Sequence, residues 1–136
     1  MGKTNLKRML LGALAAGLLM WVIECAAATL YIDQMTAAMR AHNLSMDESP
    51  AIIATSLAVS LIAGFTIMFF YTACRPRLGP GPKTAVTVAS ILWFGGYLLS
   101  LIGVRMMGLF SNSLIAMWGA IGLVEMNLAA LLGAYI

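Results

Sequence analysis

The chain has 136 residues, of which 62% are hydrophobic and 10% are charged, and its formal net charge is +3. This composition lies outside the range of soluble domains, so it excludes an ordinary soluble enzyme or nucleic-acid-binding domain and indicates an integral membrane protein with one domain, residues 1–136. The basic residues lie between long apolar runs, where they bear on membrane topology rather than on nucleic-acid binding.

Four apolar blocks follow one another along the chain. They cover about residues 9–32, 51–74, 84–104 and 114–136. Each block has about the 20 residues that an α-helix needs to cross a bilayer core of about 30 Å. The strands of a membrane barrel would instead alternate polar and apolar residues over about ten positions. The sequence therefore predicts an all-α membrane protein, an up-and-down bundle of four transmembrane helices.

The basic residues are distributed unequally between the two predicted sides of the membrane. Six precede the first block or lie in the connection 75–83, and two lie in the other connections. They are, in that order, Lys3, Lys7, Arg8, Arg75, Arg77 and Lys83, then Arg40 and Arg105. The positive-inside rule then predicts that both termini are cytoplasmic. The three basic residues of the connection 75–83 are expected to contact lipid headgroups or a cytosolic partner.

The outer connection, residues 33–49, is the only long one. Its first part, "DQMTAAMRAHNL", places apolar residues on one helical face and polar residues on the others. It therefore predicts either a short interfacial helix or a continuation of the first transmembrane helix. Asp47 and Glu48, at the end of this connection, favour the positive end of the helix that follows.

Capping residues and prolines predict where the helices begin and end. Ser49 is expected to cap the second helix, with Pro50 as its first residue. This helix is expected to end at about Arg75, because a residue that precedes proline avoids the helical conformation. The fourth helix is expected to take its cap from Ser111 or Asn112.

Two carboxylates, Glu24 and Glu125, lie inside the apolar blocks. Because the first and fourth helices run in opposite directions, both carboxylates are expected in the middle third of the bilayer. A lone carboxyl group there costs about 2.5 to 3.5 kcal/mol on insertion scales, so both should face protein or water. Asn127 points to a different face of the fourth helix, where it could make a separate interhelical hydrogen bond.

Two interpretations of these carboxylates remain open. They could be a coupling pair that binds and releases a proton or cation. Alternatively, each could be protonated and hold helices together through a hydrogen bond to a backbone carbonyl or to a polar side chain. The side chains considered are Thr29, Tyr97, Ser100 and Asn127.

Small residues recur at helical spacing and predict close contacts between helices, because they let two backbones approach. They are Gly12, Ala16, Gly17, Ala28, Gly96, Ser100, Gly119 and Gly122.

The sequence offers little for catalysis or metal binding. We predict no catalytic residues, no metal site and no cofactor, and expect that the protein is not an enzyme, since it contains no nucleophile elbow, P-loop or zinc-protease motif. The only histidine, His42, lies outside the predicted spans. A pigment or haem at His42 is an alternative, but one histidine without a second ligand is more often an interfacial polar residue.

Two segments resemble known families. "RPRLGPGPKTA" followed by "LWFGGYLL" resembles a stretch of small uncharacterised bacterial four-helix membrane proteins. That resemblance implies the fold and a bacterial inner-membrane location but no activity. "VIECAAATLY" is similar in kind to the first helix of small multidrug resistance transporters, in which a glutamate is essential, as Glu24 would be here. The aromatic and glycine pattern of their later helices is absent, and this chain has the additional Glu125.

From these features we expect a non-catalytic accessory or scaffold subunit of a larger bacterial membrane complex. Its partners would be lipids and other membrane subunits or further copies of the chain, with no nucleic acid. The alternative is a small proton- or cation-coupled transporter that uses Glu24 and Glu125. In either case the expected location is the bacterial inner membrane, with several spans and cytoplasmic termini.

Overall fold

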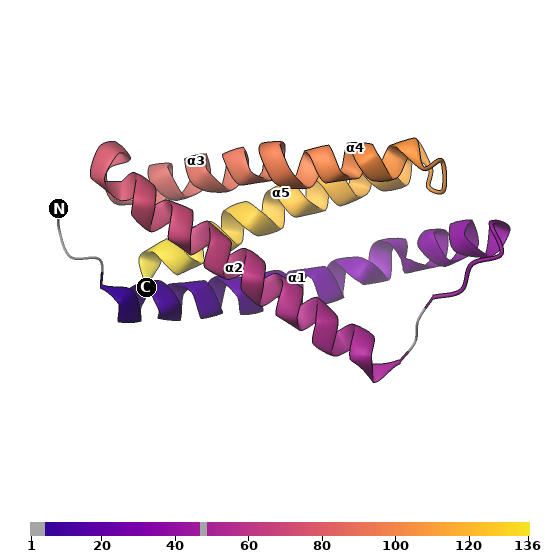
Figure 1. The fold of residues 1–136 in the computed structure, drawn as a ribbon, viewed down its shortest axis with the longest axis horizontal. Helices are drawn as coiled ribbons and strands as arrows, with labels where there is room; N and C mark the ends of the chain where they lie inside the picture. Colours follow the sequence, from indigo (N-terminus) through magenta and orange to yellow (C-terminus); the bar gives the residue numbers. More distant parts are fainter. Residues whose placement is uncertain (1–4, 47–48) are drawn as a thin grey trace.

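Four long helical segments run back and forth beside one another in the computed structural model, which describes residues 5–46 and 49–136 (Figure 1). Two of the segments are single helices, α1 (Leu6–Ala41) and α2 (Pro50–Leu78). The third consists of α3 (Pro82–Leu92), the π-helical η1 (Trp93–Leu98) and α4 (Leu99–Met106), and the fourth is α5 (Asn112–Tyr135).

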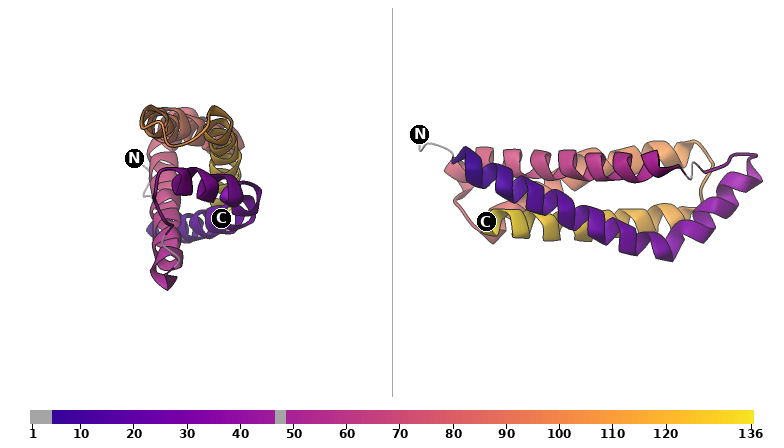
Figure 2. Two further views of the ribbon diagram at one scale, coloured as in Figure 1. Left: turned by 90° about the vertical axis from the view of Figure 1, so that its right-hand side faces the viewer. Right: turned by 90° about the horizontal axis from the view of Figure 1, so that it is seen from below.

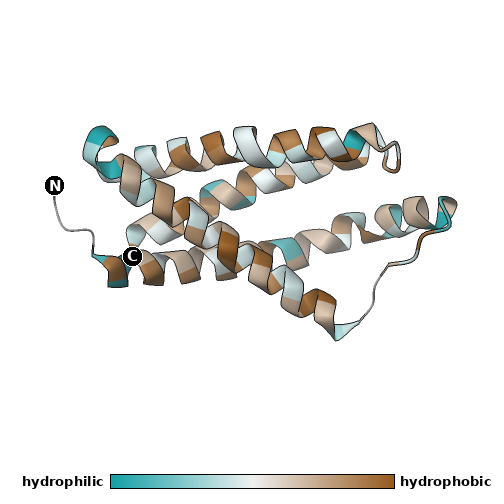
Figure 3. Cartoon of the chain, in the orientation of Figure 1, coloured by the Kyte–Doolittle hydropathy of each residue, from teal (hydrophilic) through white to brown (hydrophobic). Residues whose placement is uncertain are grey.

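Within the described residues, the four segments are long and apolar enough to cross a membrane. This confirms the predicted all-α class and the four-helix bundle. The start of α1, the end of α5 and the α2–α3 turn lie at one end of the bundle, which we name the terminal end (Figure 1). The end of α1, the start of α2 and the α4–α5 turn lie toward the opposite, far end. Hydrophilic residues gather at these ends, whereas the middle of the helices is mostly hydrophobic (Figure 3).

Helix α1 is longer than the predicted span 9–32. It continues without interruption through residues 33–41, so the predicted short interfacial helix is not a separate element and the alternative, a continuation of the first helix, is the correct one. These residues contain no glycine or proline that would end the helix. The helix ends where Asn43 takes a positive φ of 58°. Asp47 and Glu48 lie outside the described residues, as does Lys3.

The predicted cap residues are confirmed at two helices. Ser49 precedes α2, with Pro50 as its first residue, and the Ser111 hydroxyl accepts a hydrogen bond from the Leu114 backbone N–H at the start of α5.

The prediction that the second helix ends at about Arg75 is wrong, because α2 continues through Pro76 to Leu78. Pro76 lies in the last turn, where its missing N–H removes one helical hydrogen bond without ending the helix. The Gly79 N–H donates to the Arg75 carbonyl 2.9 Å away, across the proline. The predicted connection 75–83 therefore shrinks to Gly79–Gly81, and both of these glycines have positive φ.

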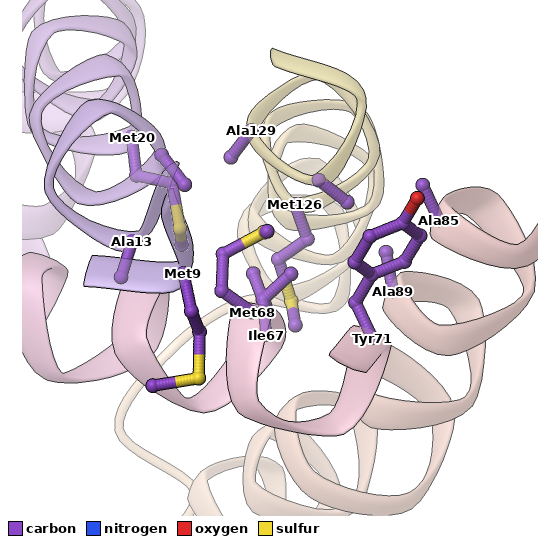
Figure 4. Close-up of a cluster of buried hydrophobic side chains, with 12 residues drawn as sticks. Met9, Ala13, Met20, Ile67, Met68, Tyr71, Ala85, Ala89, Met126 and Ala129 are labelled. Atoms are coloured by element: carbon purple, nitrogen blue, oxygen red, sulfur yellow. The ribbon is translucent and has the colours of Figure 1, made fainter. Parts of the chain in front are cut away.

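The core of the terminal half is built from alanine and methionine side chains (Figure 4). Ala16, Ala85 and Ala129 are fully buried, and Met68 is only 3% exposed. Small side chains let the four segments approach closely, and the flexible methionine side chains fill the remaining gaps. This packing closes the bundle at the terminal end.

Glycines make the closest helix crossings. A Cβ atom on Gly64 of α2 would lie 2.6 Å from the Ala13 carbonyl oxygen and 2.7 Å from the Gly17 Cα atom of α1. A Cβ atom on Gly12 would lie 2.5 Å from the carbonyl oxygen of Gly133 in α5. Only glycine fits at these backbone-to-backbone contacts.

The bundle opens toward the far end. Helix α2 packs against α1, α3 and α5, but within the described residues it makes no contact with η1 or α4. Its first residues, 50–56, are exposed, and Figure 1 shows that α2 diverges from the third segment toward the far end. In the far half, α5 therefore packs mainly between α1 on one side and η1 and α4 on the other.

Candidate functional site

The antiparallel register of α1 and α5 brings Glu24 and Glu125 to the same level. The rings of Tyr31 and Trp118 touch edge to face with their centroids 5.8 Å apart. Glu24 precedes Tyr31 by seven residues, and Glu125 follows Trp118 by seven. Seven residues are two helical turns, so the backbones of both glutamates lie roughly 10 Å along the helices from those of Tyr31 and Trp118, in the same direction and on the same faces.

Tyr31 binds Glu24 directly. The Tyr31 hydroxyl donates a hydrogen bond to Glu24 Oε1, because side chains on a helix point back toward its N-terminus and two turns are within reach of a tyrosine. Tyr31 is buried and Glu24 is half-buried. Tyr31 was not among the partners expected for Glu24. Its spacing of seven residues from Glu24 was the signal that could have identified it.

Glu125 is more deeply buried, with 6% of its surface exposed. Its Oε2 atom is buried and has no hydrogen-bond partner. Glu24 and Tyr97 are close enough to interact with Glu125 electrostatically. The two carboxylates therefore lie within electrostatic range of each other, and they differ in that Glu24 has a hydroxyl donor whereas one oxygen of Glu125 is unsatisfied.

The π-helical segment η1 directs two aromatic residues onto α5. Trp93 Nε1 donates to the Gly119 carbonyl at 3.0 Å, and the Tyr97 hydroxyl donates to the Trp118 carbonyl at 3.4 Å. The Tyr97 ring lies directly against Gly122, where a Cβ atom would collide with it. Gly122 is one turn before Glu125 on α5, so the absence of a side chain there lets the phenol ring lie beside the carboxylate.

The wider turn of η1 explains why two predicted packing residues of the third segment do not face α5. Its contact residues toward α5 are spaced by four, namely Ala85, Ala89, Trp93, Tyr97 and Leu101. An α-helix has 3.6 residues per turn, so a spacing of four drifts off one face by about 40° per step. The π turn absorbs this drift. The predicted packing residues Gly96 and Ser100 are consequently exposed.

Most of the other predicted packing residues do lie at helix contacts. Gly12, Ala16 and Gly17 are buried in α1, and Gly119 and Gly122 are buried in α5. Ala28 packs beside the Tyr31 contact. The sequence analysis missed Gly64 and Gly133, which are the backbone partners of Gly17 and Gly12.

Asn127 lies away from the carboxylate pair. Its Oδ1 atom accepts a hydrogen bond of 3.4 Å from the Ser90 hydroxyl of α3, and its Nδ2 donates to the Leu123 carbonyl at 2.8 Å. The Thr29 hydroxyl donates to the Ala26 carbonyl and the Ser100 hydroxyl to the Gly96 carbonyl, each within its own segment. Neither hydroxyl therefore bonds to Glu24 or Glu125. Both had been considered as partners of the glutamates in the interpretation that the carboxylates hold helices together.

The remaining predicted residues lie near the ends of the bundle. Arg75, Arg77 and Lys83 are exposed at the terminal end. His42 is exposed near the far end, where its Nδ1 atom is 2.9 Å from the Ala38 carbonyl oxygen. Among residues 5–46 and 49–136, no three histidine, cysteine or acidic side chains gather to hold a metal ion.

The fold and the site together define a small polytopic membrane protein with a carboxylate–aromatic cluster inside its helical bundle. We name Glu24, Tyr31, Tyr97, Trp118 and Glu125 the carboxylate cluster. No protein-family model matches the chain, and searches of curated proteins and of solved structures found no match.

Proposed function

We propose that the protein is a small proton- or cation-coupled transporter whose coupling site is the carboxylate cluster. One observation carries the proposal: Glu125 is buried with an unpartnered oxygen, within electrostatic range of Glu24, in a bundle whose helices are long enough to cross a membrane. Two like charges at this depth repel each other and lose hydration, so a proton or a bound cation would stabilise the pair. The proposed location is the bacterial inner membrane, with both termini cytoplasmic.

The asymmetry of the two carboxylates supports exchange at the site. Glu24 Oε1 already accepts the Tyr31 hydroxyl, whereas Glu125 Oε2 is buried without a partner. An unsatisfied buried carboxylate oxygen costs free energy until a proton or cation binds there. Glu125 is therefore the proposed binding group, and Glu24 the neighbouring charge that adjusts its affinity.

The open far half supports access to the site. Because α2 does not touch η1 or α4, its far half can move relative to them without breaking a contact between them. The crossing of Gly17 and Gly64 would serve as the fixed point of such a movement, since the two backbones touch there. Movement of one helix about a close crossing is a common way to gate access.

Vesicle experiments test the proposal. Proteoliposomes that trap a pH-sensitive dye are given an inward gradient of Na⁺ or K⁺, and proton flux is recorded. Glu24→Gln and Glu125→Gln should each lower the flux at least about tenfold, whereas Asp33→Asn, at an exposed carboxylate of the same helix α1, should leave it within about twofold of wild type. Absence of flux in the wild type, or equal flux in both Gln variants and wild type, would contradict the proposal.

The second candidate is the accessory or scaffold subunit, and one observation favours it. Gly95, Gly96 and Gly103 lie on η1 and α4 with nothing within 4 Å of the position of a Cβ atom. Such a surface lets another helix approach closely in a membrane. Gentle purification separates the two candidates: a stoichiometric complex with other membrane proteins supports the accessory function, and an isolated protein with proton-linked activity supports the transporter.

A further inference from the structure

A cavity at the terminal end contains two arginines and is separate from the carboxylate cluster. Its volume is about 990 Å³, and it lies where α1 and α3 begin and where α2 and α5 end. Arg8 of α1 and Arg75 of α2 both line it. Since these helix ends mark the boundary of the membrane-spanning segments, the cavity lies at the depth of the lipid headgroups.

The Tyr71 ring holds the Arg75 side chain in place. Its guanidinium carbon lies 5.8 Å from the centroid of the Tyr71 ring, in a cation–π contact. Tyr71 is 4% exposed, and its hydroxyl accepts a hydrogen bond of 3.1 Å from the Gly81 N–H. The α2–α3 turn and Arg75 are thus fixed to the same buried side chain. A guanidinium ordered in this way loses less entropy when it binds an anion.

The two charged side chains that line the cavity, Arg8 and Arg75, are both basic. None of its lining residues in the described chain is acidic, and Lys7, Arg77 and Lys83 lie near the same end. Two helices begin and two end there, so their dipoles largely cancel, and the arginine side chains determine the local potential. The site is built for an anion.

Part of the cavity lining is apolar. Met9 and Met68, which are 8% and 3% exposed, line it together with Leu131, and the first two belong to the core cluster shown in Figure 4. The volume lies within the range of small-molecule sites, roughly 300–1,000 Å³, and the lining combines basic with apolar side chains, as an amphipathic ligand would require. An inorganic anion alone would leave the apolar surface of Pro76, Pro80 and Leu131 uncovered.

We propose that this cavity binds one anionic phospholipid. Its phosphate would accept hydrogen bonds from the guanidinium groups of Arg8 and Arg75, and its glycerol and first acyl carbons would cover Leu131, Pro76 and Pro80. Guanidinium pairs bind phosphate oxygens through charge-assisted hydrogen bonds. The proposal is independent of proton or cation transport.

Lipid binding to the purified full chain tests the site. Native mass spectrometry in a mild detergent measures retention of phosphatidylglycerol, with phosphatidylcholine as the neutral comparison and inorganic phosphate as the competitor. The Arg8→Gln/Arg75→Gln pair should weaken phosphatidylglycerol retention about tenfold. The matched control is Arg77→Gln/Lys83→Gln, which removes two charges from the same end outside the cavity and should change retention less than about twofold. Arg8→Lys/Arg75→Lys keeps the charge and should recover part of the affinity.

Each outcome decides the proposal. Selective loss in the cavity pair, with phosphatidylglycerol retained over phosphatidylcholine, supports it. Equal loss in the control pair would show a diffuse surface charge effect and overturn it. Full displacement of the lipid by inorganic phosphate at millimolar concentration would show a free-anion site instead, because the apolar lining would then contribute nothing. If the cavity pair fails to fold by circular dichroism, the lysine pair carries the comparison: retention equal to the wild type would then exclude bidentate binding by the arginines.

Discussion

The two halves of the bundle are held together by different groups. Near the termini, glycines bring backbones into contact, as at Gly17 with Gly64 and at Gly12 with Gly133. In the far half, the contact between α1 and α5 is made by rings, with Trp118 between Tyr31 and Phe110 at centroid distances of 5.8 and 5.1 Å. Backbone contacts leave no room for adjustment, whereas ring contacts tolerate small shifts.

This difference explains where the carboxylate cluster lies. Glu24 and Glu125 lie between the half closed by glycines and the half closed by aromatic rings. Polar groups in the membrane need a rigid frame that sets their distance, and an exchange site also needs a side that can open. The terminal half provides the frame, and the divergence of α2 provides the opening. Three substitutions test this division of roles.

The largest effect is expected for Gly64→Leu. The new side chain would collide with the backbone of α1 at Ala13 and Gly17, and overpacking of this kind costs about 3 kcal/mol of unfolding free energy. Denaturation in mixed micelles, followed by circular dichroism, measures the loss. Gly103→Leu is the control, since nothing lies within 4 Å of that position. Equal stability of the two variants would mean that the glycine crossing does not hold the terminal half together.

Tyr31→Phe should have an intermediate effect. It removes the hydroxyl that donates to Glu24 but keeps the ring contact with Trp118. Loss of a hydrogen bond to a carboxylate costs about 1.5 kcal/mol, which the same unfolding assay detects. Tyr135→Phe, at a side chain that is 90% exposed, should be neutral. A neutral Tyr31→Phe would show that Glu24 does not depend on this donor for its position.

The smallest effect is expected for Ser90→Ala. This substitution removes the 3.4 Å hydrogen bond from Ser90 to Asn127, and interhelical hydrogen bonds in membrane proteins average about 0.6 kcal/mol. Ser100→Ala provides the comparison, because the Ser100 hydroxyl bonds only to the Gly96 carbonyl of its own segment. If Ser90→Ala lowered the unfolding free energy more than Tyr31→Phe does, the main polar support of the bundle would lie at α3 rather than at the carboxylate cluster.

Hydrophobicity and charge alone predicted the helices and the depth of the two carboxylates. Such properties act through composition over many residues, so four apolar blocks are enough to define four spans. The partners of individual side chains were harder to predict. Gly17 was recognised as a packing residue, but its counterpart Gly64 was not. Which residue of α2 meets Gly17 is decided by where the two helices cross, and the periodicity of one helix alone does not give that point.

One error comes from treating a helix as ideal. Pro76 was expected to end α2, yet it is tolerated in the last turn, where few hydrogen bonds remain to be lost. Gly96 and Ser100 were predicted to pack because they are small, but η1 directs Tyr97 toward α5 and leaves both of them on the surface of the chain. The spacing of four from Ala85 to Leu101 was the signal that could have revealed the π turn.

Helix α1 is also much longer than its neighbours. It has 36 residues against 24 in α5, or roughly 54 Å against 36 Å. A bilayer matched to α5 leaves the last turns of α1, with Asp33 and Arg40, standing outside the hydrocarbon, where α1 bends (Figure 2). Tyr31 precedes these turns by two residues. A thicker membrane would draw these turns inward or tilt the helix, so the bilayer thickness itself acts on the residue that holds Glu24.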